Sequence, residues 1–362
     1  EVIACCHNRK NIMGRYPEQS IEEIWKGSEF NTLRNYIKND DLSYGCDVCK
    51  YALLSENFDG AKNGLYDRYK IRSYPQIMEF ELDNRCNLEC TICNDLFSSS
   101  FGNSDKVTRN SPYNDAFVEQ LKPFIPHLKE TKFYGGEPFL IPIYYQIWEL
   151  LLEKNPRAKI MVQTNGTVLN DKIKSLLEKG NFHINVSIDS FEKDTFEQIR
   201  KKASFEKTME NLDYFENYCK KRKTHLGIIP TPHRNNVFHL AEIIRQANFR
   251  NAKVYFNTLI SPYELALWNL PSDDLEKIIK ILSTETFSNK TQIEKENAHH
   301  FQDFLKQLEA WKENNSKEIS GKIQISNQEI EQIRLEFLEN LKEALADDTL
   351  LIIDTFINIL NE

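Results

Sequence analysis

The stretch RCNLECTICND, residues 85–95, places three cysteines at the spacing C-x3-C-x2-C. Cys86, Cys90 and Cys93 come directly after QIMEFELD (76–83), an apolar segment that alternates like a β-strand. A structural zinc site is tetrahedral and needs four ligands, and no fourth cysteine or histidine stands near these three. The spacing therefore predicts a metal site in which one position is left open by the protein.

The chain on either side of this stretch alternates between strand-like and helix-like patterns. The strand candidates are 76–83, 131–134, 159–164, 183–188, 225–229 and 252–259. Apolar residues recur at helical spacing between them, in two sets: Phe117, Leu121, Phe124, Ile125 and Leu128, and Phe205, Met209, Leu212 and Phe215. Such alternation predicts right-handed βαβ crossovers and a parallel sheet covered by helices. Six units within about 76–260 fit an α/β fold with a partial (β/α)6 TIM-like barrel better than a closed barrel of eight.

We divide the chain into three parts. Residues 1–70 form a small cysteine-containing domain with one predicted helix, SIEEIWKGSEFNTLRNYI (20–37), for which Ser20 and Glu23 make a capping box. Residues 71–262 hold the partial barrel. Residues 263–362 are rich in Lys, Glu and Leu at helical spacing, and WKENNSKEISG (311–321) is the expected linker between helices.

Composition excludes several classes of protein. A net charge of −8 over 362 residues argues against a nucleic-acid partner held by its phosphates. No apolar run approaches membrane-spanning length, and no signal-peptide pattern opens the chain. The first residue is Glu, so we expect a fragment or a processed form. Eight cysteines are too few for a disulfide scaffold, and their clustering points to metal or redox chemistry in a reducing cytoplasm.

Polar or glycine residues follow each of the first four strand candidates. The cysteine stretch follows the first, GGEP (135–138) the second and TNG (164–166) the third, while Ser187 and Asp189 close the fourth. In a parallel barrel the loops at the carboxyl ends of the strands build the active site. We therefore expect these four segments to meet at one rim.

The cysteine spacing followed by GGEP resembles the radical S-adenosylmethionine (radical SAM) superfamily, over about residues 76–260. The resemblance implies a 4Fe–4S cluster held by three thiolates, whose open iron is chelated by the amino and carboxylate groups of S-adenosylmethionine. It also implies reductive cleavage of that cofactor to a 5′-deoxyadenosyl radical, which abstracts a substrate hydrogen. A reductant such as a flavodoxin or ferredoxin would supply the electron.

The same resemblance assigns roles to individual residues. Cys86, Cys90 and Cys93 would be the iron ligands. Gly135 and Gly136 would admit the methionine ammonium close to the backbone, with the loop fixed by Glu137 and Pro138. The remaining cofactor contacts would be Asn165, Ser187, Asp189 and, for the cofactor carboxylate, Arg200. This chain departs from the usual pattern after Arg200, where KKASF follows, and at Ile92, where an aromatic residue that packs on the adenine is usual.

Four further cysteines stand at the front of the chain, in ACCHN (4–8) and CDVC (46–49). With the intervening S-x-x-E-I-W helix they resemble the auxiliary-cluster domain called twitch or SPASM, placed before the radical core. That resemblance implies a second iron–sulfur cluster held by Cys5 or Cys6 together with Cys46 and Cys49. A four-thiolate zinc site is the alternative, because zinc and iron–sulfur ligation use the same donors. A Cys46–Cys49 disulfide is disfavoured in a reducing compartment.

Plainer interpretations stand beside these. The cysteine triad could recruit a distant histidine to a structural zinc. Gly135–Gly136 and Asn165–Gly166 could be simple turns. Asp189 could be a helix cap and Arg200 a solvated helix residue. Cys219 is expected to be a buried apolar filler, and His299–His300 an exposed pair without a role.

Three functions compete. The leading hypothesis is a radical enzyme acting on a carbon–hydrogen bond, with a peptide or protein favoured over a free metabolite as substrate. The second is an iron–sulfur electron carrier, which would have no need of the GGEP and Asn165 positions. The third is a zinc-stapled interaction module whose acidic helical tail binds a partner. For that tail we favour packing over the barrel mouth.

Overall fold

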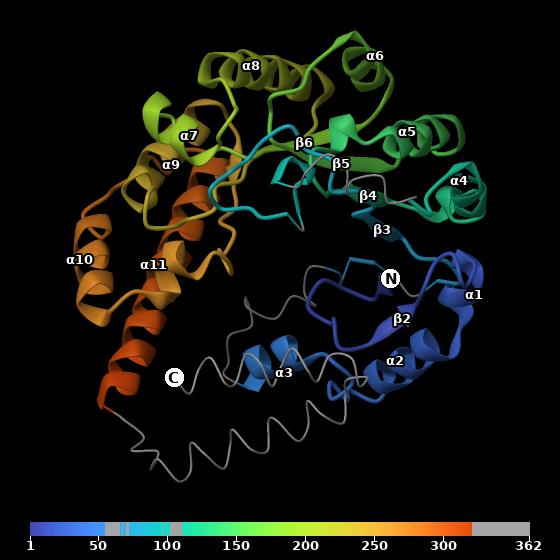
Figure 1. Cartoon of the computed structure of the whole chain (residues 1–362), viewed down its shortest axis with the longest axis horizontal. Coiled ribbons are helices and arrows are strands. Elements are labelled where there is room, and N and C mark those ends of the chain that lie inside the picture. Colours follow the sequence, from blue (N-terminus) through green and yellow to red (C-terminus); the bar gives the residue numbers. More distant parts are fainter. Residues whose placement is uncertain (55–65, 67, 70–71, 96, 102–110, 321–362) are drawn as a thin grey trace, which may run out of the picture.

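A six-stranded parallel sheet forms the centre of the molecule, and its strands follow one another in chain order, β3 to β8. The computed structural model describes residues 1–54, 66, 68–69, 72–95, 97–101 and 111–320. The strands are β3 (Ile77–Phe80), β4 (Glu130–Phe133), β5 (Lys159–Thr164), β6 (Phe182–Val186), β7 (Leu226–Ile228) and β8 (Lys253–Val254). All six predicted strands are therefore present, and the fold is the expected α/β partial barrel (Figure 1).

Helices connect the strands and lie along the outer side of the curved sheet (Figure 1). Those of this layer are α4 (Asp115–Leu121), α5 (Pro142–Lys154), α6 (Asp171–Lys179), α7 (Lys193–Ile199), α8 (Phe205–Arg222) and α9 (Leu240–Phe249). Both apolar sets predicted to be helical contribute to the main core. In the first set, however, α4 ends at Leu121, and Ile125 lies in a separate 3-10 turn.

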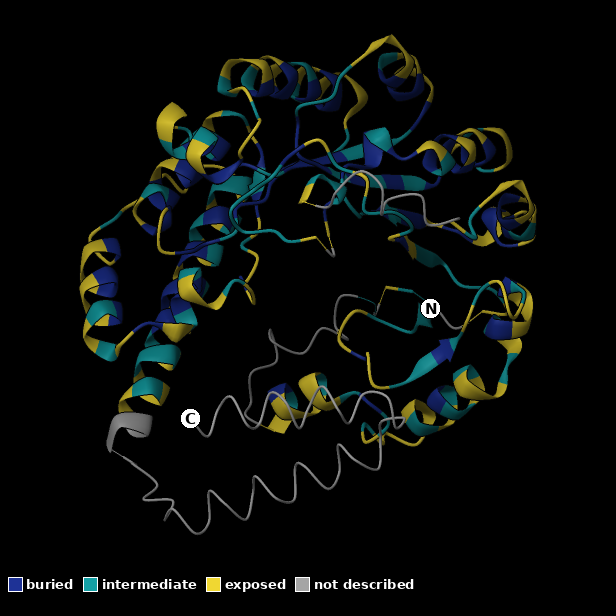
Figure 2. Ribbon diagram, viewed as in Figure 1, coloured by how far each residue is buried: buried dark blue, intermediate teal, exposed yellow. Residues whose placement is uncertain are grey.

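The two faces of the sheet have opposite character. Along β5, Ile160 and Val162 are buried, whereas Lys159, Met161 and Gln163 are only partly buried. Successive side chains of a strand point to opposite faces, so the buried residues face the helices and the others face the inside of the barrel. Burial follows the same division in Figure 2, with the dark residues concentrated between sheet and helices. The hydrophobic core is therefore one layer, between the sheet and its helices.

The β8 edge of the sheet is closed by α11 (Gln292–Ser320). Asn297 is fully buried there. Its Oδ1 accepts a hydrogen bond from the Val254 N–H at 2.8 Å, and its Nδ2 donates to the Ala252 carbonyl at 2.9 Å. This side chain satisfies backbone groups that an edge strand otherwise leaves exposed to pairing with another chain.

The N-terminal part is a small unit with a core of its own. Strands β1 (Val2–Ile3) and β2 (Ile12–Gly14) pair antiparallel, followed by α1 (Ile21–Lys26), α2 (Ser28–Lys38) and α3 (Asp47–Leu54). Met13, Ile24 and Leu33 are buried together, with Cys46 packed against them. The unit joins the barrel through Ile21, which lies in the main core and whose N–H donates to Gln120.

The single helix predicted over 20–37 is wrong, because the structure has two. The predicted capping box is present, with Ser20 and Glu23 bonded to each other's backbone. Gly27 then adopts an extended conformation (φ −68°, ψ 172°), which ends α1 and begins α2. Glycine has the lowest helix propensity after proline, so a break at Gly27 costs little.

The C-terminal part contains α10 (Ser272–Leu282) and α11, which pack on each other and on the main core. The linker predicted at 311–321 is wrong for 311–320, which continue α11, and Gly321 lies outside the described residues. The rest of the tail, 322–362, likewise lies outside them. No helix in the described part of the chain is both long and apolar enough to cross a bilayer.

Candidate functional site at the carboxyl ends of the strands

The three cysteines lie on the loop that leaves β3, and all three thiols are free. Ser99 and Ser100 hold the first of them, since the Cys86 N–H donates to Ser99 Oγ at 3.2 Å and Ser100 Oγ donates to the Cys86 carbonyl at 2.8 Å. Burial raises the pKa of Cys90 to about 11, although the nearby Arg200 charge opposes this. In the absence of a metal the Cys90 thiol is therefore protonated at neutral pH.

The spacing of the thiols bears on which metal suits them. Four sulfurs around one zinc ion stand about 3.8 Å apart, as follows from a tetrahedron with bonds of about 2.3 Å. Within the described residues no three cysteine, histidine or acidic side chains gather closely enough for a single ion. In a four-iron cluster each thiolate binds a different iron, so its ligands stand farther apart. Three free thiols on one loop, without a fourth ligand, fit such a cluster.

The GGEP loop after β4 is bonded directly to the segment that precedes Cys86. The Gly136 N–H donates to the Asp83 carbonyl at 3.2 Å, and the Glu137 N–H donates to the Arg85 carbonyl at 2.7 Å. A Cβ on Gly135, whose φ is +110°, would collide with the Asp83 carbonyl, and one on Gly136 would collide with that of Arg85. The two glycines thus allow the two loops to touch.

Glu137 is fully buried and ties this loop to the end of β5. Its carboxylate accepts hydrogen bonds from the Asn165 N–H at 2.7 Å, from Thr164 Oγ1 at 2.8 Å and from the Phe139 N–H at 3.1 Å. Burial raises the pKa of Glu137 to about 7, and the three donors only partly offset that effect. This carboxylate is an internal support for the rim and does not face solvent.

Asn165 is the residue that reaches the cysteine loop from β5. Its Nδ2 lies 3.0 Å from Asn87 Oδ1 and 3.8 Å from Cys86 Sγ, and its Oδ1 accepts from Thr167. Gly166 follows with φ +77°, a conformation that favours glycine. Asn165–Gly166 is thus a turn, as in its plainer interpretation, but the Asn165 side chain also lies beside the Cys86 thiol.

Asp189 and Arg200 form a buried ion pair. Arg200 Nη2 lies 2.7 Å from Asp189 Oδ2, and both side chains are buried. The plainer interpretations of these residues are wrong, because Arg200 is not solvated and Glu192 rather than Asp189 caps α7. Ser187 lies at the same rim, where its N–H donates to the Thr164 carbonyl at 2.9 Å.

Two residues after β7 belong to this rim and were missed in the sequence. The Thr231 N–H donates to Asp189 Oδ1 at 2.8 Å. His233 is fully buried, with Nδ1 2.8 Å from the Thr231 carbonyl and with Nε2 lacking a hydrogen-bond partner in the described part of the chain. The segment IPTPHRNN (229–236), which follows the fifth strand as the other motifs follow theirs, was the available signal.

The front cysteines are brought together by contacts between their loops. Asn8 is buried, and its Nδ2 donates to the Tyr44 carbonyl at 3.0 Å, while Lys10 pairs with Asp47 at 2.7 Å. The pKa of Cys46 is raised by burial and then by the neighbouring thiols of Cys5 and Cys49. Cys5 and Cys49 thus lie near Cys46, although the described residues hold no three such side chains close enough together for a single metal ion. Cys219, by contrast, is buried in the main core, as expected.

Cys6 differs from the other three because it is exposed. Burial of part of its side chain raises its pKa first, followed by the charges of Cys5 and of Glu79 on β3. Cys6 therefore lies on the inner side of the sheet, close to Glu79 on β3.

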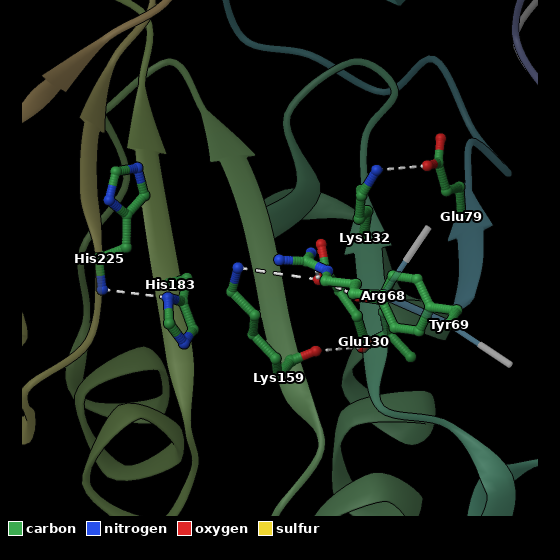
Figure 3. A network of polar contacts seen from close by, with 9 residues as sticks. Arg68, Tyr69, Glu79, Glu130, Lys132, Lys159, His183 and His225 are labelled. Carbon is green, nitrogen blue, oxygen red and sulfur yellow. Dashed lines mark hydrogen bonds and ion pairs between the residues drawn. The ribbon is translucent and has the colours of Figure 1, made fainter. Parts of the chain in front are cut away.

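The inner face of the sheet carries a polar network, shown in Figure 3. Each of its three strand lysines has a carboxylate partner: Lys132 pairs with Glu79 at 2.5 Å, Lys159 with Glu130 at 3.8 Å, and Lys253 with Glu296. Arg68 also contacts Glu130, at 3.0 Å. Glu130 is thus shared by two cations, and these pairs contain four cations and three carboxylates.

Two histidines continue this face on β6 and at the start of β7. The His225 N–H donates to His183 Nδ1 at 3.0 Å, so the His183 ring proton is on Nε2. Burial and the nearby Lys159 lower the pKa of His183 to about 3. His183 is therefore a neutral hydrogen-bond donor at physiological pH.

Comparison with known proteins agrees with this geometry. Residues 81–247 match the family described as the Radical SAM superfamily. This stretch is less than half of the chain, and over it the chain is similar to the radical SAM superfamily. Members of this superfamily use a 4Fe–4S cluster and S-adenosylmethionine, and the open thiol set at Cys86, Cys90 and Cys93 fits that cluster.

Curated relatives match part of the chain. A probable GTP 3′,8-cyclase of Methanocella arvoryzae is 32% identical over 139 residues, which cover 38% of this chain and 42% of the relative. A GTP 3′,8-cyclase of Clostridium perfringens is 25% identical over 137 residues, or 38% of this chain and 41% of the relative. The chain thus spans less than half the length of these curated relatives.

Solved structures resemble it more loosely. Native anSMEcpe with bound AdoMet has a TM-score of 0.45 at 20% identity, covering 57% of this chain and 59% of that one. SuiB of Streptococcus suis bound to S-adenosylmethionine has a TM-score of 0.44 at 13% identity, covering 73% of this chain and 61% of that one.

The buried Glu137 predicts a pH-dependent stability. Its pKa is raised from 4.5 in the unfolded chain to about 7 in the fold, so its contribution is complete below about pH 4.5 and is lost as the pH rises through 7. The loss amounts to about 3 kcal/mol. His183 and His225, whose pKa values are lowered to about 3 and about 4, have the opposite effect on stability in this pH range and are present in both proteins. In urea unfolding of the metal-free protein, the free energy of unfolding of the wild type relative to Glu137→Gln should therefore decline from pH 4.5 to 7.5.

Glu210→Gln, a change at an exposed glutamate, is the matched control and should keep the wild-type pH profile. If the curves of Glu137→Gln and wild type ran parallel from pH 4.5 to 7.5, Glu137 would not have the raised pKa.

Proposed function

We propose that this protein generates a 5′-deoxyadenosyl radical at the β3–β6 rim and uses it to abstract a hydrogen atom from a substrate on the inner face of the sheet. The observation that carries the proposal is the open set of Cys86, Cys90 and Cys93, packed against the GGEP loop and Asn165. Bound there, the cluster and S-adenosylmethionine supply the radical by reductive cleavage of the sulfonium.

The chain's own residues then have distinct tasks. The three thiolates hold the cluster, and Ser99 and Ser100 fix their loop. The GGEP loop, supported by Glu137, presents its backbone to the methionine ammonium. Asn165, Ser187 and Asp189 contact the ribose and methionine parts of the cofactor, and Arg200 contacts its carboxylate.

A second cluster is proposed at the front cysteines, in a twitch/SPASM-like domain spanning 1–70. Cys46 and Cys49 stand three residues apart at the start of α3, which places them on one side of the helix. The influence of Cys5 on Cys46 and the exposure of Cys6 support Cys5 as their companion.

For the substrate we propose a peptide or protein segment. The inner face offers the neutral donor His183 and lysines that each contact a carboxylate, and such groups suit carbonyl groups better than a polyanion. A nucleoside triphosphate would need cations that are free of carboxylate partners. Each lysine on the described strands of this face already contacts a carboxylate.

The second candidate is cyclisation of a guanine nucleotide. The observation that favours it is the similarity of the core to proteins described as GTP 3′,8-cyclases. The charge balance of the inner face weighs against it.

The proposal also includes an electron donor and a cellular compartment. An electron must reach the cluster from a reductant such as a flavodoxin or ferredoxin. A reducing cytoplasm suits all eight cysteines, which are free. Neither nucleic acid nor a membrane is proposed as a partner.

The first prediction concerns S-adenosylmethionine. Anaerobically reconstituted protein given dithionite should release 5′-deoxyadenosine and methionine, and Cys86→Ala, Cys90→Ala or Cys93→Ala should reduce release at least about 100-fold. Cys219→Ala, which removes a thiol from the core, is the control and should retain cleavage. Liquid chromatography with mass spectrometry measures both products. Undiminished 5′-deoxyadenosine from the three variants would refute the assigned ligands.

The second prediction concerns the front cysteines. A protein with Cys86, Cys90 and Cys93 all changed to Ala should still bind iron and sulfide after reconstitution. A further Cys5→Ala or Cys46→Ala should remove them, whereas Cys6→Ala should not. Iron, sulfide and zinc analysis distinguishes a cluster from a zinc site. Stoichiometric zinc without iron would show that the front cysteines form a structural zinc site instead.

The third prediction separates the substrates. Hydrogen abstraction transfers a substrate hydrogen to 5′-deoxyadenosine, so a deuterated substrate adds one mass unit. A peptide pool from fully deuterated protein should produce this gain, and perdeuterated GTP should not. Deuterium transferred from GTP alone would assign the nucleotide reaction instead.

A further inference from the structure

Arg200 is held beside Cys90 by two backbone hydrogen bonds. The Glu89 N–H donates to the Lys201 carbonyl at 3.1 Å, and the Thr91 N–H donates to the Ile199 carbonyl at 2.8 Å. The two residues that flank Cys90 are thus bonded to the two that flank Arg200. This arrangement fixes the cysteine loop against the end of α7, with Cys90 and Arg200 at the centre of the contact.

The guanidinium is a buried charge with one carboxylate partner. Arg200 is 7% exposed, and its Nη2 lies 2.7 Å from Asp189 Oδ2. The other carboxylate oxygen is held by the Thr231 N–H at 2.8 Å, on the β7 side of the rim. The negative end of the pair is therefore anchored toward β7, and the positive end belongs to the segment that contacts the cysteine loop.

Part of the guanidinium is left without a protein partner. Arg200 Nε is buried and has no hydrogen-bond partner within the described residues. A buried donor of this kind normally has a partner, because leaving it unpaired costs free energy. The unpaired donor indicates that something absent from the polypeptide completes the surroundings of Arg200.

We propose that Arg200 is a fixed positive charge that raises the reduction potential of the cluster at Cys86, Cys90 and Cys93. The inference rests on the proposed function, since it requires that cluster. Reduction adds one negative charge to the cluster, and a nearby buried cation stabilises the reduced form more than the oxidised form. Arg200 thus eases the transfer of the electron on which cofactor cleavage depends.

A purely structural role for Arg200 makes a different prediction. If Arg200 served only to neutralise Asp189, removing either charge would disturb the rim in the same way. In our proposal the two charges act on the potential with opposite signs. Variants of the two residues therefore distinguish the roles.

The experiment is a potentiometric titration of the reconstituted full chain, followed by electron paramagnetic resonance. The relevant cluster is the one whose signal changes on addition of S-adenosylmethionine. Arg200→Gln should shift its midpoint potential to more negative values, Arg200→Lys should stay near wild type, and Asp189→Asn should shift it to more positive values. Lys201→Gln removes the same charge from an exposed neighbour and should leave the potential unchanged.

The double variant guards against misfolding. Arg200→Gln alone leaves a buried carboxylate unpaired, which is strongly destabilising, whereas Asp189→Asn with Arg200→Gln removes both charges. The double variant should titrate below Asp189→Asn. Equal potentials for these two proteins, each with a full complement of iron, would overturn the inference. A wild type without the cluster signal would instead refute the proposed function.

Discussion

The carboxylate of Glu137 is the interaction on which the arrangement of the rim depends. It accepts hydrogen bonds from the end of β5, while its own N–H is bonded to the segment leading into the cysteine loop. One buried residue thereby joins the loops that follow three successive strands. If the loops moved apart, the buried carboxylate would lose its hydrogen-bond donors, which is costly. The loops are therefore held in one relative position.

A second constraint is that charged side chains are excluded from the apolar core and therefore lie at the rim or on the inner face. The strands bury their outer side chains against helices, so polar groups are tolerated only where the strands end or on the inner face. Asp189 and Arg200 compensate each other there, as do the lysine–carboxylate pairs of the inner face. The same rule leaves a polar surface on the inner face of the sheet.

Much of this arrangement could be predicted from the sequence. Strand periodicity located all six strands, and the motifs after the first four strands located most of the rim, because parallel strands deliver their carboxyl ends to one edge. The break at Gly27 and the continuous α11 through 311–320 were missed, since helix ends depend on tertiary contacts as well as on local sequence. Thr231 and His233 were missed because no strong motif marks them.

The burial of Arg200 could not be read from its sequence neighbours. KKASF suggests a solvated turn, and only the contact between residues 199–201 and the cysteine loop encloses the side chain. Likewise, Asn8 joins the two front cysteine loops through a bond to a residue 36 positions away. Long-range contacts of single side chains leave no periodic pattern in a sequence.

The one-sided core has a consequence for how such a protein can diverge. Stability comes mainly from the layer between sheet and helices, so exchanges among inner-face residues such as Met161 or His183 remove little packing. The loops of the rim are held by their own backbone contacts and do not rely on that surface either. Selection can therefore change the inner face of the sheet while the rim and the folding free energy stay nearly unchanged.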